Sequence, residues 1–107
     1  MTTFDKRKDA FENKFAHDAE LEFKITVRRN KLVGEWAAGL MGLEGEEAAG
    51  YAKSVVQADF IEVGDEDVIG KVLTDFAVAG VEVNDAAIRA MLAEKTEAAR
   101  QQILSAT

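Results

Sequence analysis

No proline occurs among the 107 residues of the chain. Proline interrupts a helix because it lacks a backbone N–H and because its ring clashes with the preceding turn. Alanine, leucine, glutamate, lysine and arginine, which favour helices, are frequent. The sequence therefore predicts an all-α protein whose helix interiors contain no proline break.

Turn signals divide the chain into four expected helices. Gly42 and Gly45 bracket a short turn, and Gly80 is expected to end a helix as its C-cap. Asp65, followed by two more acids, and Asn84, followed by one, are expected N-caps. These signals place helices at 20–42, 45–61, 65–79 and 84–104, after a separate N-terminal segment. Such short connections predict antiparallel neighbours in a four-helix bundle.

Apolar residues recur at helical spacing in each expected helix, which predicts the bundle core. The expected stripes are Leu21, Ile25, Leu32, Trp36 and Leu40; Ala48, Ala52, Val55, Val56 and Phe60; Val68, Ile69, Val72, Leu73 and Phe76; and Ile88, Met91, Leu92, Ala99 and Ile103. The segment 21–27, LEFKITV, alternates like a strand. We predict a helix there, because no second strand is available to satisfy its backbone groups.

Charge and composition exclude several classes of function. The net charge of −7 argues against binding to nucleic acid phosphates and to anionic lipid. The chain has no cysteine and no apolar run near the ~20 residues of a membrane span. The N-terminus has basic residues, but the apolar region of a secretory signal does not follow them. We therefore expect a cytoplasmic protein with no direct membrane insertion.

The N-terminal segment carries three of the six phenylalanines between charged residues. At ~100° per residue, a helix would place Phe4, Phe11 and Phe15 within about 40° of one another. The segment 1–18 is neutral, with four basic and four acidic residues, so the rest of the chain carries the net charge. The pattern fits a helix that lays an apolar ridge into a partner's groove. It also fits core residues of a fifth helix, the commoner use of such a stripe.

Other candidate sites give weaker signals. His17, the only histidine, lies near acids that would raise its pKa, so it is a candidate pH switch, although an exposed residue with no role at a helix junction is the commoner interpretation. The acidic stretch 64–67 fits helix capping better than a calcium loop. The basic cluster 28–31 fits a solvated helix face better than a phosphate site, and Trp36 and Tyr51 are expected in the core. No nucleophile–base pair, metal cluster or cofactor motif was found, so we expect neither an enzyme nor a cofactor.

Four stretches together resemble the zeta subunit family of α-proteobacterial F-type ATP synthases. They are TTFDKRKDAFENKFAHDAELEFK (2–24), RRNKLVGEWAAGLMG (28–42), YAKSVVQADF (51–60) and VGDEDVIGKV (63–72). The resemblance implies an inhibitor of ATP hydrolysis by the synthase's catalytic head. It also implies a four-helix bundle, residues 19–107, with a mobile, partly helical N-terminal inhibitory arm, residues 1–18.

The resemblance further implies that the arm enters an interface between catalytic subunits near the rotor shaft. On this chain the partner-binding residues would be Phe4, Asp5, Lys6, Arg7, Lys8, Phe11, Lys14 and Phe15. The protein would then be cytoplasmic and peripheral to the inner membrane through the synthase. Two alternatives stay open at this point: a small module that senses or weakly binds nucleotide, and a structural or assembly factor of the synthase.

Overall fold

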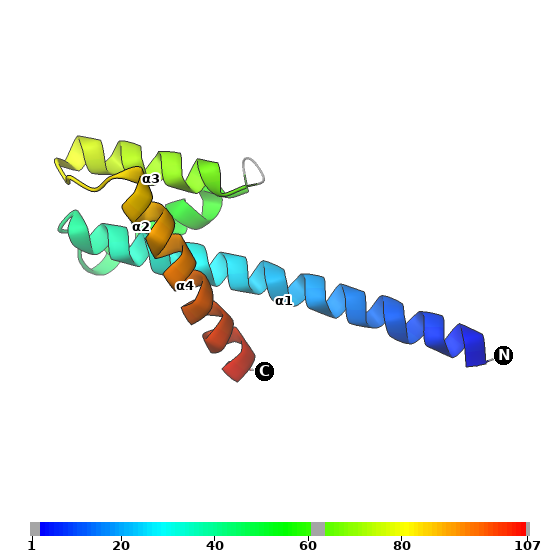
Figure 1. The fold of residues 1–107 in the computed structure, drawn as a ribbon. Helices are drawn as coiled ribbons and strands as arrows, with labels where there is room; N and C mark the ends of the chain where they lie inside the picture. Colours follow the sequence, from blue (N-terminus) through cyan, green and yellow to red (C-terminus); the bar gives the residue numbers. More distant parts are fainter. Residues whose placement is uncertain (1–2, 61–63, 107) are drawn as a thin grey trace.

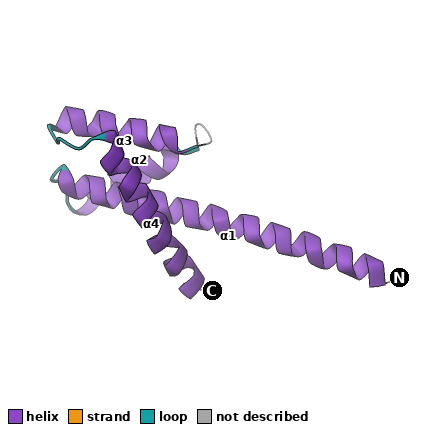
Figure 2. Cartoon of the chain, viewed as in Figure 1, coloured by secondary structure: helices purple, strands orange, loops and turns teal. Residues whose placement is uncertain are grey.

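The computed structural model describes the backbone of residues 3–60 and 64–106, and the side chains of these ranges from Asp18 onward. It contains four helices: α1 (Thr3–Leu40), α2 (Gly45–Ala58), α3 (Asp65–Ala79) and α4 (Asp85–Ala106). The described residues include no strand, and the segment 21–27 is helical (Figure 2). The all-α prediction with four helices is therefore confirmed.

The first helix is far longer than its sequence signals suggested. It spans 38 residues and includes most of the segment that we expected to precede it. The expected start at residue 20 is wrong, because neither glycine nor proline occurs before Gly34 and nothing in the sequence ends the helix there. The N-terminal segment and the first bundle helix are thus one continuous helix.

The other helices pack around the C-terminal half of α1, which contacts all three of them. The N-terminal half of α1 extends away from this assembly (Figure 1). The molecule is accordingly elongated, with extents of 64 × 24 × 21 Å. The bundle is therefore centred on one half of α1, and the other half forms an arm.

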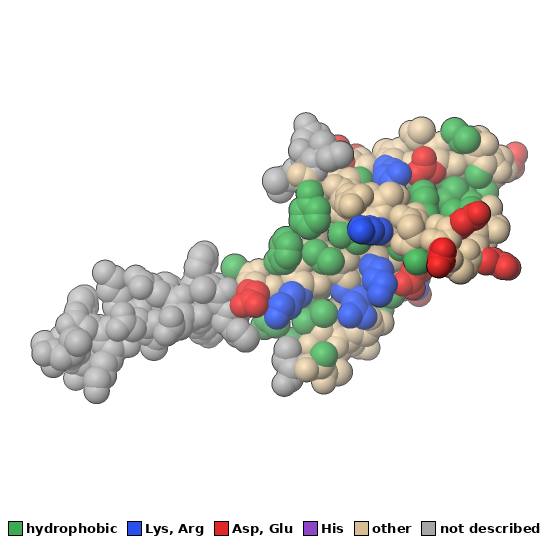
Figure 3. All heavy atoms as spheres, turned by 180° about the vertical axis from the view of Figure 1, so that it is seen from behind, with side chains coloured by type: hydrophobic (Ala, Val, Ile, Leu, Met, Phe, Trp, Pro, Cys, Tyr) green, Lys and Arg blue, Asp and Glu red, His purple; other side chains and the backbone are tan. Residues whose placement is uncertain are grey.

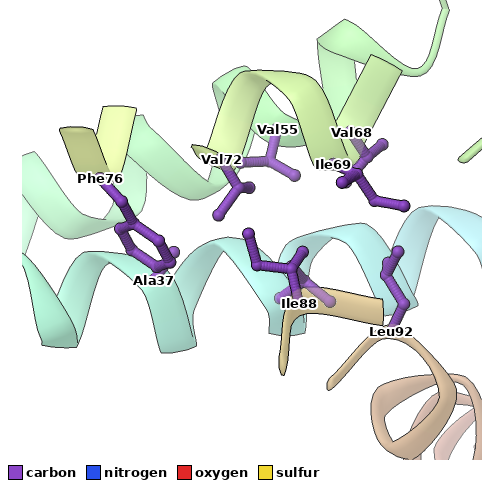
Figure 4. Close-up of a cluster of buried hydrophobic side chains, with 9 residues drawn as sticks. Ala37, Val55, Val68, Ile69, Val72, Phe76, Ile88 and Leu92 are labelled. Atoms are coloured by element: carbon purple, nitrogen blue, oxygen red, sulfur yellow. The ribbon is translucent and has the colours of Figure 1, made fainter. Parts of the chain in front are cut away.

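The core lies where α1, α2, α3 and α4 meet (Figure 4). Its buried members share aliphatic or aromatic side chains: Val33, Ala37, Val55, Val68, Ile69, Val72, Phe76, Ile88 and Leu92. Trp36 and Tyr51 pack against this cluster as expected, and the Trp36 ring meets the edge of Phe76 with centroids 5.7 Å apart. Burial of these side chains is the main favourable contribution to folding.

The predicted stripes are correct for α3 and largely correct for α4, but the α1 stripe is partly wrong. Its buried apolar positions are Ile25, Val33, Ala37 and Ala38, whereas Leu40 is exposed. Phe60, expected in the core beside α2, is 62% exposed. In α1 the error arises because polar Arg29 and Asn30 occupy core-facing positions, so the apolar pattern does not trace the buried face. Phe60 follows the last residue of α2, Ala58, and is therefore outside that helix.

Turn residues end the helices largely as expected. Gly42 and Gly80 have positive φ angles of 78° and 74°. After α3, the Val81 N–H donates to the Phe76 carbonyl at 2.8 Å, and Leu43 N–H donates to the Ala38 carbonyl in the same way after α1. These six-to-one bonds define glycine-terminated helix ends.

Of the two expected N-caps, one is confirmed. The Asn84 Oδ1 accepts a hydrogen bond of 2.8 Å from the Ala87 N–H, as an N-cap does. Asp65 is not an N-cap, because Gly64 occupies that position and Asp65 is the first residue of α3. Its charge still lies in the first turn, where an acid interacts favourably with the helix dipole.

Gly34 sets the distance between α1 and α2. A Cβ atom at this position would lie 2.6 Å from the Ala52 Cα atom, which is backbone and cannot rotate away. The two helices therefore approach more closely than any side chain at position 34 would allow.

We expect Gly34→Ala to lower the free energy of unfolding by about 1–3 kcal/mol, because α1 and α2 must separate to admit the methyl group. Gly70→Ala is the matched control, since a Cβ at this α3 position meets nothing within 4 Å. That variant should be more stable by about 0.5–1 kcal/mol through helix propensity. Urea unfolding followed by circular dichroism measures both changes, and an equally stable Gly34→Ala protein would contradict the packing argument.

Candidate functional site

The predicted partner-binding residues lie in the arm. Residues 3–17 are helical and continue α1, but their side chains are outside those that the structure describes. This applies to Phe4, Asp5, Lys6, Arg7, Lys8, Phe11, Lys14, Phe15 and His17. At ~1.5 Å per residue, the helical segment from Thr3 to His17 is about 22 Å long. Their proposed contacts and the pH switch at His17 therefore stay predictions.

The base of the arm is fixed by contacts with α4. Going along α1, residues 18–20 are exposed, Leu21 is half-buried, and Ile25 is the first buried side chain. Glu22 forms an ion pair with Arg100 at 3.2 Å, and Arg28 donates a hydrogen bond to Gln102 at 3.0 Å. The transition from arm to bundle thus occurs over about one turn of helix, between Leu21 and Ile25.

A polar network with two buried members, Arg29 and Asn30, connects α1 to the residues on either side of the α2–α3 connection. The Nε and Nη2 atoms of Arg29 donate to the Asn30 Oδ1 at 3.0 and 2.9 Å. The Asn30 Nδ2 donates to Asp59 at 3.0 Å, and Arg29 Nη1 forms an ion pair with Asp65 at 3.0 Å. The network therefore joins the residues that flank the α2–α3 connection to the centre of α1.

This network corrects the interpretation of the basic cluster 28–31. A solvated helix face was expected, but Arg29 and Asn30 are only 8% and 1% exposed. A buried cation is tolerated when it is paired and hydrogen-bonded, and Asp65 and Asn30 provide that pairing. Sequence periodicity could not reveal it, because the partners are about 30 residues away along the chain.

Two further ionisable groups have shifted pKa values. Burial, and then the hydrogen bond and negative charge of Asp75, raise the pKa of the Tyr51 phenol above its usual value of 10.0. The phenol donates to Asp75 at 2.8 Å, and Asp75 also accepts from Lys71 at 3.0 Å. At the surface, hydrogen bonds and the charge of Arg89 lower the pKa of Glu66. Both shifts belong to contacts between helices rather than to a catalytic arrangement.

Among the described residues, no group of three or more acids or histidines could hold a metal ion. Within the same part of the chain, none of the helices combines the length and the hydrophobicity that crossing a membrane requires.

A groove that the sequence analysis missed lies between α1 and α2. Apolar side chains line it and basic side chains surround it. Its one visible signal in the sequence is the spacing of Lys24, Arg28 and Lys31, which places three cations along one side of a helix. Its α2 half could not be assigned to the same site before the packing of α1 against α2 was known.

Comparison with known proteins assigns the family. A family model described as "ATPase inhibitor subunit zeta" matches residues 1–102. The chain belongs to this family. The resemblance found in the sequence is thereby confirmed, and the family is one of regulatory rather than catalytic proteins, whose description implies interaction with an ATP synthase.

Solved structures support the fold of this zeta-family chain. One chain, titled "Solution NMR structure of the protein", is 40% identical and superimposes with a TM-score of 0.72. The match covers 81% of this chain and 99% of that chain. Among curated proteins there is no match.

Raising the pH should destabilise this zeta-family protein more than its Tyr51→Phe variant. The phenol has a raised pKa in the folded protein, whereas in the unfolded chain it ionises near its usual pKa of about 10. Its contribution to stability is therefore complete below about pH 10. That contribution declines as the pH rises toward the raised pKa of the folded state. Urea unfolding at about pH 8 and about pH 11 measures the difference. Because Tyr51 is the only tyrosine, tyrosinate absorbance reports this group alone. An equal loss of stability in both proteins would contradict the assignment.

Proposed function

We propose that this protein inhibits ATP hydrolysis by the catalytic head of an F-type ATP synthase through its N-terminal arm. Residues 1–18 are the inhibitory arm, and residues 19–107 form the bundle that carries it. The family supports the inhibitory role in general. The insertion of the arm between catalytic subunits near the rotor shaft is our proposal.

The observation that carries the proposal is the path of α1. The helix continues without interruption from the bundle to Thr3, and its N-terminal half extends away from α2, α3 and α4 (Figure 1). A structural role in the core would require this segment to run beside the other helices. An extended helix with one end fixed is suited to entering a cleft in another protein.

The register of this helix brings the three aromatic residues together. Because the backbone is helical from Thr3 onward, Phe4, Phe11 and Phe15 occupy positions i, i+7 and i+11 of one face. This is the spacing of anchors in helix-in-groove recognition. Each ring would gain about 1.5–3 kcal/mol when it is transferred from water into an apolar cleft.

Inhibition would follow from binding to one state of a cyclic machine. Catalytic interfaces must open and close in turn during hydrolysis, and a helix bound in one interface stabilises that single state. Lys6, Arg7, Lys8 and Lys14 would pair with carboxylates of the partner, with Asp5 as a further contact. Since residues 1–18 are neutral, the arm avoids the repulsion that the acidic bundle would meet at an acidic surface.

This function places the protein on the cytoplasmic side of the inner membrane, at its periphery, through contact with the synthase. His17 lies at the base of the arm beside Asp18. A charge change there between about pH 5 and 8 would alter the arm next to its point of attachment, which is why we keep it as the proposed pH switch.

Deleting residues 1–18 should abolish inhibition of the cognate head, because the segment that enters the interface is removed. The measurement is the ATPase rate of the purified head over a titration of each protein. Circular dichroism of the shortened chain checks that α2, α3 and α4 still form. Full inhibition by the shortened chain would refute the arm as the inhibitory element.

Replacing Phe4, Phe11 and Phe15 together by alanine should raise the half-inhibitory concentration by more than about a hundredfold, because three apolar anchors are lost. Val78→Ala is the control: this apolar side chain of α3 is 86% exposed and lies outside both the arm and the groove between α1 and α2. We expect Val78→Ala to inhibit as the wild type does. Unchanged potency of the triple variant would overturn the assignment of the anchors.

A further inference from the structure

The groove between α1 and α2 is an apolar surface that the bundle leaves uncovered. Its volume is about 490 Å³, and Ile103 of α4 contributes to one wall. The lining side chains are mainly apolar: Phe23, Val27, Ala49, Ala52, Val56 and Ile103. Phe23 is 56% exposed although its ring contacts that of Phe60 at a centroid distance of 6.0 Å. The groove therefore exposes apolar side chains that a bound partner could bury.

The border of the groove is basic although the protein is acidic. Four cations lie along it, against one carboxylate, that of Glu35: Lys24, Arg28, Lys31 and Lys53. On the face shown in Figure 3, Lys and Arg side chains gather next to hydrophobic ones. In a chain of net charge −7, such a concentration of positive charge is a local feature that attracts an anionic partner.

These cations are poorly compensated within the protein. Among the side chains that the structure describes, Lys31 and Lys53 form neither an ion pair nor a hydrogen bond. Arg28 donates only to the neutral amide of Gln102, and Lys24 pairs with Glu20 at 3.3 Å on the exposed surface. The positive charge at the border is thus available to a partner.

The shape of the groove indicates what it binds. The α1 residues that line it run from Phe23 to Glu35, which corresponds to about 18 Å of helix. A small anion would use the border and leave the apolar lining uncovered. An amphipathic helix of about three turns would cover the lining with its apolar face and meet the cations with acids beside that face.

The arm of the same chain does not fit this groove. Because α1 is one helix from Thr3 to Leu40, its N-terminal half cannot return to a groove that its own residues 23–35 line unless the helix breaks. The arm also has no net charge, whereas the cations at the border attract an acidic partner. A second copy of the acidic chain would meet repulsion over most of its surface.

We propose that this groove binds an amphipathic helix with acidic flanks that belongs to the ATP synthase catalytic head. The inference rests on the proposed function, which supplies the protein that carries the helix. The groove and the arm then form two contacts on one rigid α1 helix. Binding at the groove raises the effective concentration of the arm at its interface and fixes its direction.

Charge reversal at the border tests the electrostatic half of the proposal. In the full chain, Lys31→Glu and Lys53→Glu should each raise the Kd for the purified head by about fivefold or more, and the difference should shrink at high salt. Lys95→Glu is the matched control, with the same change of charge on α4 outside the groove. Kd values of the groove variants equal to that of Lys95→Glu would overturn the proposal.

A neutral substitution tests the apolar half. Ala49→Gln adds a polar side chain to the lining without changing charge, and Ala90→Gln makes the same change at an exposed α4 position outside the groove. Ala49→Gln should raise the Kd for the head by about threefold or more, and Ala90→Gln should leave it unchanged. If only the charge variants weaken binding, the groove does not take an apolar helix face and the proposal fails. Thermal unfolding of each variant confirms that the fold is intact.

Failure of the groove proposal can be distinguished from failure of the arm proposal by comparing inhibition at saturating protein concentration. The groove variants should still inhibit fully at saturating concentration, whereas the arm variants should lose inhibition. Loss of inhibition confined to the arm variants, with unaltered affinity in the groove variants, would leave the proposed function standing and refute the groove.

If ADP saturably shifts the amide signals of Val27 and Lys53 while Lys53→Glu binds the head normally, the groove is a small-anion site. A dimer that Lys53→Glu dissociates, with unchanged affinity for the head, would also overturn the proposal.

Discussion

The continuity of α1 is the constraint on which the rest of the structure depends. A single helix of 38 residues provides both the centre of the bundle and the arm, so the packing of one half sets the direction of the other. This packing is tight, because Gly34 permits a close approach to the Ala52 backbone. The α1 residues Ile25, Val33 and Ala37 are also buried. A helix transmits orientation well because each residue is hydrogen-bonded to the turn before it. Contacts near Ile25 and Glu22 therefore determine where the arm points.

Charge is distributed unequally over this scaffold. The arm is neutral and the groove between α1 and α2 has a basic border, although the chain as a whole is acidic. Arg29 belongs to the same helix as the border cations but is buried and fully engaged by Asn30 and Asp65. The buried Arg29 and the border cation Arg28 thus differ by one residue along the helix, which is about 100° around its axis. Such a division lets one helix stabilise the bundle and attract an acidic partner at the same time.

Local signals predicted some features well and others poorly. The ends of α1 and α3 at glycine and the start of α4 after Asn84 follow from short-range hydrogen bonding, which the sequence specifies directly. The N-cap lies one residue before Asp65 because α3 begins at Asp65 itself, and Gly64, with a φ of 129° that favours glycine, occupies the cap position. The expected helix start at residue 20 was wrong because no residue before it ends a helix, and α1 begins at Thr3. Leu40 and Phe60 were placed in the core by periodicity, which describes one helix and not the surfaces that cover it.

The sequence by itself determined that the chain is helical, where glycine divides the later helices, and that three phenylalanines share one face of the N-terminal helix. These properties depend on residues within about one or two turns of each other, so no knowledge of the fold is needed to read them. Only the tertiary structure decided which of the basic residues 28–31 is buried, that α1 leaves the bundle as an extended arm, and that Lys31 of α1 and Lys53 of α2 border one groove. Those features arise from contacts between residues that are far apart in the chain, and such contacts exist only after the helices have packed.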